Sequence, residues 1–329
     1  MILDLPAPTW DHAAEAFIAA HAMSGAWAGG TAVKYRQTLA ALGGRLAGSG
    51  SGAAADVGLL GTPAGAAALG AAFTASFGGL APATRARHLS ALRSALAWWA
   101  EAGWVTGDPT AGWARPKVPV DTTRALTRPQ VGSIWALDVP LRDKALWRTV
   151  YETAGRAEEV LGLDVPDLDL PNRRGRVVAK GGAVEWVHWQ TGAAMLLPRL
   201  LGSRREGPVF LTRRRPARAV AAVDLCPVTG RARLSYRRAE EAFELATRPL
   251  ANPGAARDEL EDLRGWTLHQ LRHSLLTHEA EDGTSTPMLL ARSRHASVRS
   301  LERYARPGPE AVAQHVARSD PAARRRRPR

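Results

Sequence analysis

The sequence has a single cysteine, Cys226, among its 329 residues. One thiol cannot form a disulfide within the chain, and it cannot supply a cysteine cluster for structural zinc. A Walker-type glycine-rich loop and a His-Glu-x-x-His segment are also missing, which argues against ATP-dependent and zinc-hydrolase chemistry. We therefore expect a protein that uses no metal and no other cofactor.

Long apolar segments are absent as well. Residues 57–84 carry no charge, but they are mostly Ala, Gly, Ser and Thr, with Pro63 and Pro82 among them. Such a segment gains too little free energy on transfer to hydrocarbon to span a bilayer. Residues 1–6 lack the basic and apolar regions of a signal peptide. We expect a cytoplasmic protein without membrane contact.

Negative charge is in the minority. Lys and Arg number 44 against 31 acidic residues, so the formal net charge is +13. This excess favours a polyanionic partner, because each phosphate contact made by Lys or Arg releases condensed counterions. The alternative explanation is a GC-rich genome, whose codons favour Arg, Ala and Gly whatever the function. The Arg-rich tail at 321–329 is typical of a non-specific phosphate tether.

The first third of the chain has the periodicity of helices. Leu89, Leu92 and Leu96 recur at three- and four-residue spacing and so share one helix face. Gly103 suits the C-terminal end of that helix. The four helices that we predict here cover residues 9–24, 30–47, 62–77 and 82–102.

Basic side chains lie on the polar faces of these helices. Lys34 and Arg36 belong to the second predicted helix, and Arg85, Arg87 and Arg93 belong to the fourth. They can form a surface that faces DNA phosphates, or they can simply be a solvated polar face. We predict DNA contacts for all five and leave the solvated face as the alternative.

A stretch without periodicity, which contains Pro116 and Pro119, indicates a linker at 116–126. Thr127 then begins a new helix as its N-cap, with Gln130 completing a capping box. After further helices the pattern changes to two apolar strands, joined by a turn that contains Lys180.

The remaining predictions for this half are mostly helical. Helices are predicted at 128–137, 140–154, 191–201, 235–248, 268–281, 286–292, 297–304 and 309–317, with a short one headed by Arg156. The strands are predicted at 177–178 and 184–189. Residues 203–232 are rich in Arg and Pro and are predicted to form an exposed insertion.

Two arginines have the chemistry that a phosphodiester requires. The transition state of its cleavage concentrates negative charge on the non-bridging oxygens. Arg156 and Arg272 each carry a guanidinium that stays charged and presents forked donors to such oxygens. The alternative is that both are ordinary surface arginines, which most of the chain's arginines must be.

The attacking group must be a side-chain oxygen that survives as an ester. The chain holds four tyrosines, at positions 35, 151, 236 and 304. Only Tyr304 lies in a basic helical segment that follows both the segment with His269 and His273 and the segment with His295. A lone helical tyrosine usually packs against its neighbours, and Tyr304 is distinguished by His295 nine residues upstream.

Together these segments resemble the tyrosine recombinase (phage integrase) family, whose members include Xer- and Cre-like site-specific recombinases. In that family Arg-x-x-Glu begins a helix, a lysine lies in a β-hairpin, and His-x-x-Arg heads a later helix. A His or Trp then precedes the nucleophilic tyrosine by nine residues. Here the four parts are Arg156 with Glu159, Lys180, His269 with Arg272, and His295 with Tyr304.

The resemblance implies a mainly α fold with a small β-sheet. Its N-terminal part would be a four-helix, SAM-like core DNA-binding domain at 1–115. A mixed α+β catalytic domain at 127–320 would follow the linker and precede the basic tail. The chain departs from the family pattern at Arg294, where glycine is usual, and at Leu301, where threonine is usual.

The resemblance also implies a role for each residue. Arg156 and Arg272 would stabilise the transition state, with Tyr304 as nucleophile, Lys180 as general acid, His269 in acid–base chemistry at the tyrosine, His295 at the transition state and Glu159 as a supporting carboxylate. The product of cleavage would be a 3′-phosphotyrosine. No metal would take part.

We therefore expect a site-specific recombinase or integrase that acts on double-stranded DNA as a homotetramer holding two sites. One alternative is a type IB topoisomerase-like nicking-closing enzyme that uses the same chemistry alone. The other is a catalytically inactive DNA-binding protein on the same fold. Base recognition depends on side-chain placement, so the sequence does not specify the DNA target.

Overall fold

The structure is a computed structural model that describes residues 7–25, 27, 29–48, 56–117, 125–178, 182–294, 298–301, 312–313 and 316–317. The chain forms two compact units, Met1–Val120 and Asp121–Arg329. Within the described ranges the protein is mainly helical and has one three-stranded sheet, which confirms the predicted fold class. No helix in these ranges is both long and apolar enough to cross a membrane.

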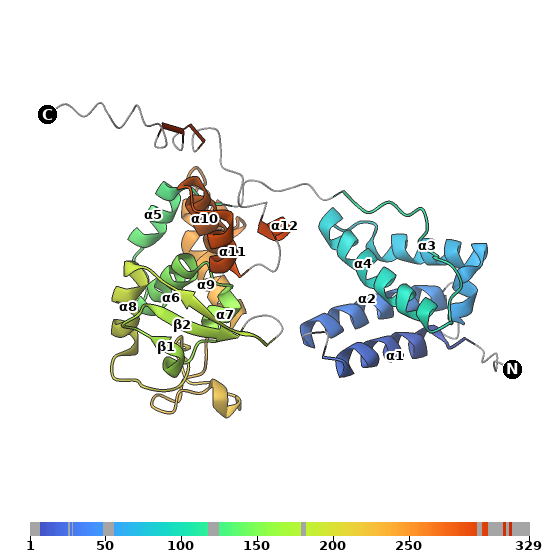
Figure 1. The fold of residues 1–329 in the computed structure, drawn as a ribbon, viewed down its shortest axis with the longest axis horizontal. Coiled ribbons are helices and arrows are strands. Elements are labelled where there is room, and N and C mark those ends of the chain that lie inside the picture. The colour runs from blue at the N-terminus through green and yellow to red at the C-terminus, as the bar shows by residue number, and fades with distance from the viewer. Residues whose placement is uncertain are drawn as a thin grey trace. The chain divides into compact units, whose positions relative to one another are not determined.

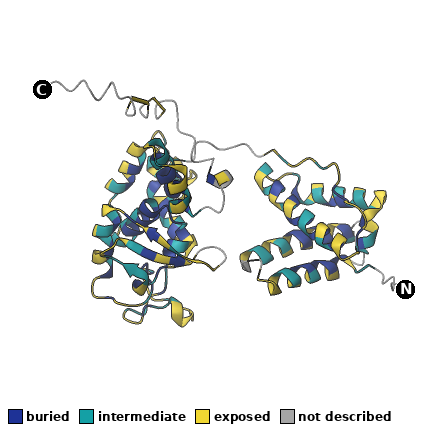
Figure 2. Ribbon diagram, viewed as in Figure 1, coloured by how far each residue is buried: buried dark blue, intermediate teal, exposed yellow. Residues whose placement is uncertain are grey.

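The first unit is built from four long helices (Figure 1). They are α1 (Trp10–Met23), α2 (Gly29–Gly48), α3 (Pro63–Phe77) and α4 (Pro82–Glu101), with a short 3-10 helix at Val57–Gly61 before α3. Figure 2 shows the buried residues on the inward faces of these helices. Each long helix therefore contributes one apolar face to a common core.

Two tryptophans fasten this core. Trp10 and Trp99 pack edge to face with ring centroids 5.2 Å apart. The indole N–H of Trp10 donates to the carbonyl of Leu39, and that of Trp99 donates to the carbonyl of Ala13, each at 2.9 Å. Gly43 is needed beside them, because a Cβ there would lie 2.7 Å from Cδ1 of Trp10. The buried indoles thus link α1 to both α2 and α4.

The second unit combines a small antiparallel sheet with several helices (Figure 1). The strands are β1 (Leu168–Asp169), β2 (Arg174–Val178) and β3 (Val184–His188), in the order β1-β2-β3. The helices are α5 (Arg128–Ala136), α6 (Leu141–Thr153), α7 (Ala157–Leu161), α8 (Thr191–Leu201), α9 (Tyr236–Ala251), α10 (Leu268–Glu281), α11 (Thr286–Ser293) and α12 (Val298–Leu301).

Helix α6 is the centre of this unit, and it packs against α8 and α10. Its Leu146, Trp147 and Val150 are at most 1% exposed. The buried carboxylate of Glu152 accepts hydrogen bonds from the backbone N–H groups of Gln190 at 2.9 Å and Ala193 at 3.0 Å. Because the first N–H groups of a helix have no partner within it, Glu152 caps α8 and fixes it to α6.

The prediction that residues 203–232 form an exposed insertion is wrong for the first part of this segment and for Cys226. Val209, Phe210 and Cys226 are fully buried. The buried guanidinium of Arg204 donates to the carbonyls of Pro208 at 2.6 Å and Val209 at 2.9 Å. The Arg and Pro content of this segment concealed a short apolar run that completes the core.

Tyr151 and His278 link α6 to α10. The hydroxyl of Tyr151 lies 2.8 Å from Nδ1 of His278, whose side chain is buried. Burial lowers the pKa of His278, and the neighbouring charge of Arg128 lowers this pKa further. The folded protein therefore holds this imidazole neutral at a pH where an exposed histidine becomes charged.

We predict that acid weakens the fold through His278. Because only the unfolded chain binds this proton readily, the free energy of unfolding should fall as the pH drops below about 6.5, by at most about 1.4 kcal/mol per pH unit. Urea unfolding at about pH 7.5 and about pH 5.5 measures the loss. The loss should be smaller in His278→Asn, while His12→Asn, at an exposed position, should match the parent chain. Equal losses in all three proteins would contradict the assignment.

Candidate active site

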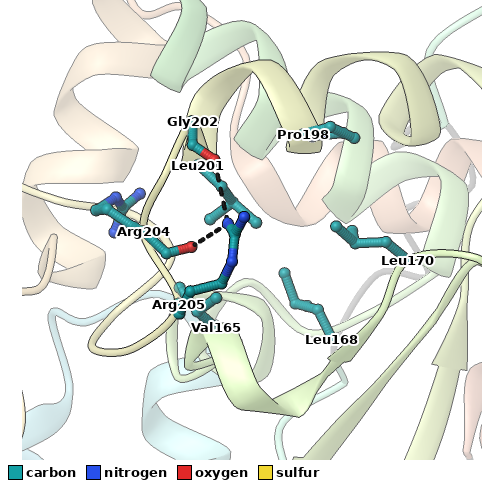
Figure 3. A pocket seen from close by; sticks show the side chains of 8 residues that line it. All are labelled: Val165, Leu168, Leu170, Pro198, Leu201, Gly202, Arg204 and Arg205. Atoms are coloured by element: carbon teal, nitrogen blue, oxygen red, sulfur yellow. Dashed lines mark hydrogen bonds between the residues drawn. The ribbon is translucent and has the colours of Figure 1, made fainter.

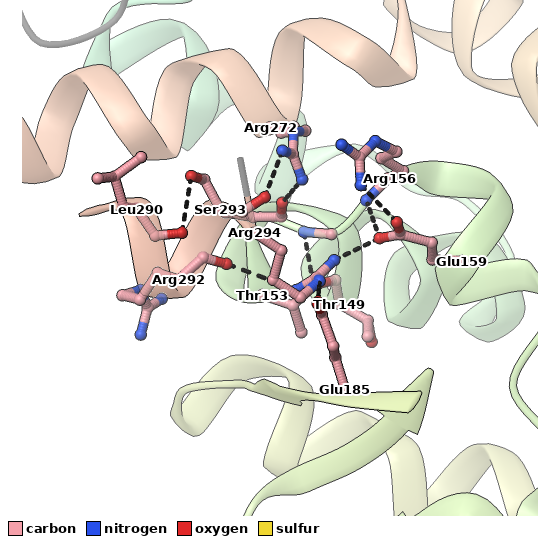
Figure 4. A network of polar contacts seen from close by, with 12 residues as sticks. Thr149, Thr153, Arg156, Glu159, Glu185, Arg272, Leu290, Arg292, Ser293 and Arg294 are labelled. Carbon is pink, nitrogen blue, oxygen red and sulfur yellow. Dashed lines mark hydrogen bonds and ion pairs between the residues drawn. The ribbon is translucent and has the colours of Figure 1, made fainter. Parts of the chain in front are cut away.

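Arg156 immediately precedes α7 and is held by Glu159 (Figure 4). The Glu159 carboxylate accepts from the backbone N–H of Arg156 at 3.1 Å and from its Nη1 at 2.6 Å. The side chain of Arg156 is 39% exposed, whereas that of Glu159 is 6% exposed. A buried carboxylate thus orients a guanidinium that still reaches the surface.

The other end of α7 is fixed by Arg233. Its Nη1 donates to the carbonyls of Leu161 at 3.1 Å and Gly162 at 2.8 Å. Cations are stabilised at this end of a helix, because the last carbonyls carry partial negative charge. The short helix that follows Arg156 is therefore held in place at both ends.

Arg272 is the most deeply buried arginine of the site. It lies on α10, is 2% exposed, and donates from Nη1 to the carbonyl of Ala154 and from Nη2 to the carbonyl of Ser293 at 2.6 Å. Ala154 is the C-cap of α6, and Ser293 is the last residue of α11. Two negative helix ends therefore compensate a charge that would be unfavourable without partners.

The arrangement brings three predicted residues to one place. Arg272 bonds to Ala154, which lies two residues before Arg156, and Glu159 follows one turn later (Figure 4). His269 lies three residues before Arg272, in the first turn of α10, and its side chain is exposed. Its ring contacts the buried ring of His273 edge to face at 4.5 Å.

Arg294 is a contact residue whose role the sequence did not reveal. Its guanidinium pairs with Glu159, and its Nε lies 3.2 Å from Oε2 of Glu185 on β3. The side chain is 5% exposed. The unusual arginine at a glycine position was the one available sign, but its two partners lie far away in the sequence.

The charge of Glu159 depends on these neighbours. Burial raises the pKa of its carboxyl, but the charge of Arg294 and the hydrogen bonds from Arg156 outweigh burial and leave this pKa below its ordinary value. Glu159 is therefore ionised at neutral pH. Its negative charge is shared between Arg156 and Arg294, and its hydrogen bonds orient Arg156.

The end of α11 contacts the site through three consecutive residues. Arg292 donates from Nη2 to the carbonyl of Glu152 at 2.7 Å, and its Nε lies 3.0 Å from Glu279. Ser293 accepts from Arg272, and Arg294 pairs with Glu159. These contacts fix the backbone immediately before position 295.

Lys180, His295 and Tyr304 lie outside the described residues. Lys180 belongs to the connection between β2 and β3, and His295 follows Arg294 directly. Tyr304 follows Leu301 by three residues. Leu301, the departure from the family's threonine, is fully buried in a cluster with four residues, namely Ala154, Leu275, Leu276 and Leu289.

The basic residues predicted to contact DNA have different surroundings in the first unit. Arg36 pairs with Glu15 at 2.8 Å, Arg93 donates to the carbonyl of Trp113 at 2.8 Å, and Arg85 lies 3.5 Å from the carbonyl of Gly78. Lys34 and Arg87 instead line one pocket of about 230 Å³ between α2 and α4. The structure thus brings these two cations together.

A larger pocket in the second unit lies away from these groups. It has a volume of about 440 Å³ and is lined mainly by apolar side chains and two arginines, as Figure 3 shows: Val165, Leu168, Leu170, Pro198, Leu201, Gly202, Arg204 and Arg205. None of the predicted reacting residues lines it. In the described part of the chain, no group of His, Cys, Asp and Glu side chains is arranged to hold a metal ion.

Comparison with known proteins defines the class. The model of the phage integrase family matches residues 125–310. Tyrosine recombinase XerC of Mycobacterium tuberculosis (strain ATCC 25177 / H37Ra) is 30% identical over 235 residues, which are 69% of this chain and 73% of that protein. XerC of Roseiflexus sp. (strain RS-1) is 29% identical over 252 residues, 74% of each chain. The chain belongs to the phage integrase family of tyrosine recombinases.

Solved structures agree on the fold. The Tn1549 transposon integrase in complex with a circular intermediate DNA has a TM-score of 0.64 at 14% identity and covers 95% of this chain and 100% of its own. XerH recombinase bound to its difH substrate has a TM-score of 0.50 at 17% identity, over 77% of this chain and 70% of its own.

We predict that Glu159→Gln destabilises the second unit by about 3 kcal/mol, because the buried guanidinium of Arg294 would lose one of its two carboxylate partners. Urea unfolding at neutral pH measures the effect. Glu158→Gln is the matched control, since Glu158 is exposed on the same helix and its loss should change the free energy by less than about 0.5 kcal/mol. Similar free energies of unfolding for both variants would show that the buried pair of Glu159 and Arg294 adds no stability.

Proposed function

We propose that this chain is a site-specific DNA recombinase that cleaves and rejoins DNA through a 3′-phosphotyrosine at Tyr304. The observation that carries the proposal is the meeting of Arg156 and Arg272 at the turn between α6 and α7. Two fixed guanidiniums match the negative charge that a phosphodiester gains in its transition state. Membership of the phage integrase family supports the same activity.

The proposed reaction exchanges one phosphate ester for another. The phenol oxygen of Tyr304 attacks phosphorus, and its proton passes to His269 or to solvent. The bond from phosphorus to the 5′ oxygen breaks, and Lys180 gives that oxygen a proton. A 5′ hydroxyl from a second strand then attacks the phosphotyrosine and gives its proton to Lys180, while the bond from phosphorus to the tyrosine oxygen breaks and that oxygen takes back a proton from His269 or solvent. Arg156, Arg272 and His295 stabilise the charge in both steps.

The two units divide this work. Residues 1–115 form the core DNA-binding domain, 116–126 the linker and 127–320 the catalytic domain, and the tail at 321–329 adds phosphate contacts. Lys34 and Arg87 are the best-placed contacts of the first unit, since they share a pocket in which each can reach a phosphate. The Tn1549 integrase was solved with DNA, which supports a DNA partner here.

The active assembly is a homotetramer that holds two DNA sites. Residues 308–320 contact a neighbouring copy in this proposal. Val312 and Val316, which are described in this segment, are 49% and 62% exposed. These two exposed apolar side chains are available for a partner to cover.

We predict that a suicide substrate traps a covalent protein–DNA complex. The substrate is a duplex that carries the inverted repeats found in the DNA beside the gene, with a nick close to the cleavage site. Cleavage releases the short fragment that bears the 5′ hydroxyl, and because this fragment diffuses away the strand cannot be rejoined. The parent chain and Tyr236→Phe, which alters an exposed tyrosine, should form the complex. Tyr304→Phe should form none, as judged by denaturing gel electrophoresis.

The outcomes separate the three candidate functions. A complex that persists in Tyr304→Phe would move the nucleophile elsewhere, and no complex with the parent chain would favour a DNA-binding protein without activity. Exchange of strands between two labelled duplexes identifies a recombinase. Relaxation of supercoiled DNA without exchange would identify a nicking-closing enzyme instead.

We predict strongly salt-dependent DNA binding. Each phosphate neutralised by Lys or Arg contributes about −0.9 to the slope of log K against log salt, so six or more contacts weaken binding about 10³-fold or more between about 50 and about 200 mM salt. Replacing Lys34 and Arg87 together by Ala should reduce the slope by about 2. Fluorescence anisotropy measures both slopes.

The control is Arg237→Ala, which removes an exposed arginine that pairs with Glu241 on α9. Its slope should equal that of the parent chain. An unchanged slope in the double variant would remove Lys34 and Arg87 from the DNA-binding surface.

A further inference from the structure

The backbone at Arg294 has a conformation that suits glycine. Its φ is +53°, in the left-handed region, where it forms the C-cap of α11. An L-residue with a side chain is disfavoured there by about 1–2 kcal/mol. The guanidinium is also almost fully removed from solvent. Favourable contacts of the side chain must offset both effects.

These contacts join two parts of the site. Arg294 pairs with Glu159, which also binds Arg156, and with Glu185 at 3.2 Å (Figure 4). Glu185 lies on β3, opposite Val177 of β2. An alternating row of charges therefore runs from Arg156 through Glu159 and Arg294 to the β2–β3 hairpin.

The contact with Glu185 is well placed to fix the hairpin near its turn. The other ion pairs of the described hairpin, from Arg174 to Asp169 and from Arg176 to Asp167, lie farther from the turn. Beyond Glu185, Val178 and Val184 are 65% and 61% exposed. Among the described residues, the ion pair between Glu185 and Arg294 is the one nearest to the segment that contains Lys180.

We infer that Arg294 is a positioning residue that fastens the β2–β3 hairpin, and so the lysine of its turn, to the Arg156–Glu159 pair. The inference rests on the proposed function, in which Lys180 protonates the 5′ oxygen. Arg294 acts through Glu159 and Glu185, since its buried guanidinium is already engaged by two carboxylates. Glu185 acts with it.

The test uses a leaving group that needs no proton. A 5′-bridging phosphorothiolate expels a thiolate, whereas the ordinary phosphodiester must expel a protonated oxygen. Single-turnover cleavage of both substrates is measured for the parent chain, Arg294→Gly, Glu185→Gln and Lys180→Ala. Arg176→Gln, which breaks an ion pair on the same hairpin, is the matched control.

We predict that Arg294→Gly and Glu185→Gln cleave the phosphodiester about 10- to 100-fold more slowly, since small displacements of a catalytic group have effects of this size. Both should cleave the phosphorothiolate at a rate within about threefold of the parent, as should Lys180→Ala. Arg176→Gln should match the parent on both substrates. If Arg294 and Glu185 only stabilised the fold, their substitutions would slow the cleavage of both substrates equally.

The contrary results are distinct. If Lys180→Ala recovers on the phosphorothiolate while Glu185→Gln and Arg294→Gly stay slow, the positioning role is wrong and the proposed reaction stands. If Lys180→Ala does not recover, the general-acid assignment fails and the positioning role fails with it. Glu185→Gln keeps the test valid even where Arg294→Gly folds poorly, because it leaves the α11 backbone unchanged.

Discussion

The burial of the Arg272 guanidinium is the constraint on which the site depends. A charge that is 2% exposed needs partners, and it finds them in the carbonyls of Ala154 and Ser293 at the ends of α6 and α11. Because each partner is a helix terminus, one side chain fixes where three helices meet. The turn that leads to Arg156 starts at this junction, so the second guanidinium is placed by the first.

The two arginines are held in different ways. Arg272 is buried and is fixed by backbone carbonyls, whereas Arg156 is fixed by a carboxylate and remains 39% exposed. Glu159 pairs with both Arg156 and Arg294, so its negative charge neutralises neither of these two guanidiniums completely. In the proposed reaction this arrangement leaves positive charge available for a phosphate while its position is fixed.

Much of this organisation could be predicted from the sequence, because it depends on local patterns. Helix α4 follows from the apolar spacing of its leucines and α5 from its capping box, and the spacing of Arg156 and Glu159 places them at one helix start. The αL conformation of Arg294 and its pairing with Glu185 depend on contacts between distant segments, which no local pattern encodes. Burial within 203–232 was missed for the same reason.

In the proposed reaction, Arg156 and Arg272 hold a single phosphate while it is bonded to Tyr304. A structure of the chain trapped on a suicide DNA substrate tests it most directly. The expected result is a phosphotyrosine at position 304 whose non-bridging oxygens lie within hydrogen-bond distance of Arg156 and Arg272. A phosphotyrosine whose oxygens meet neither guanidinium, or one formed at another residue, would contradict it.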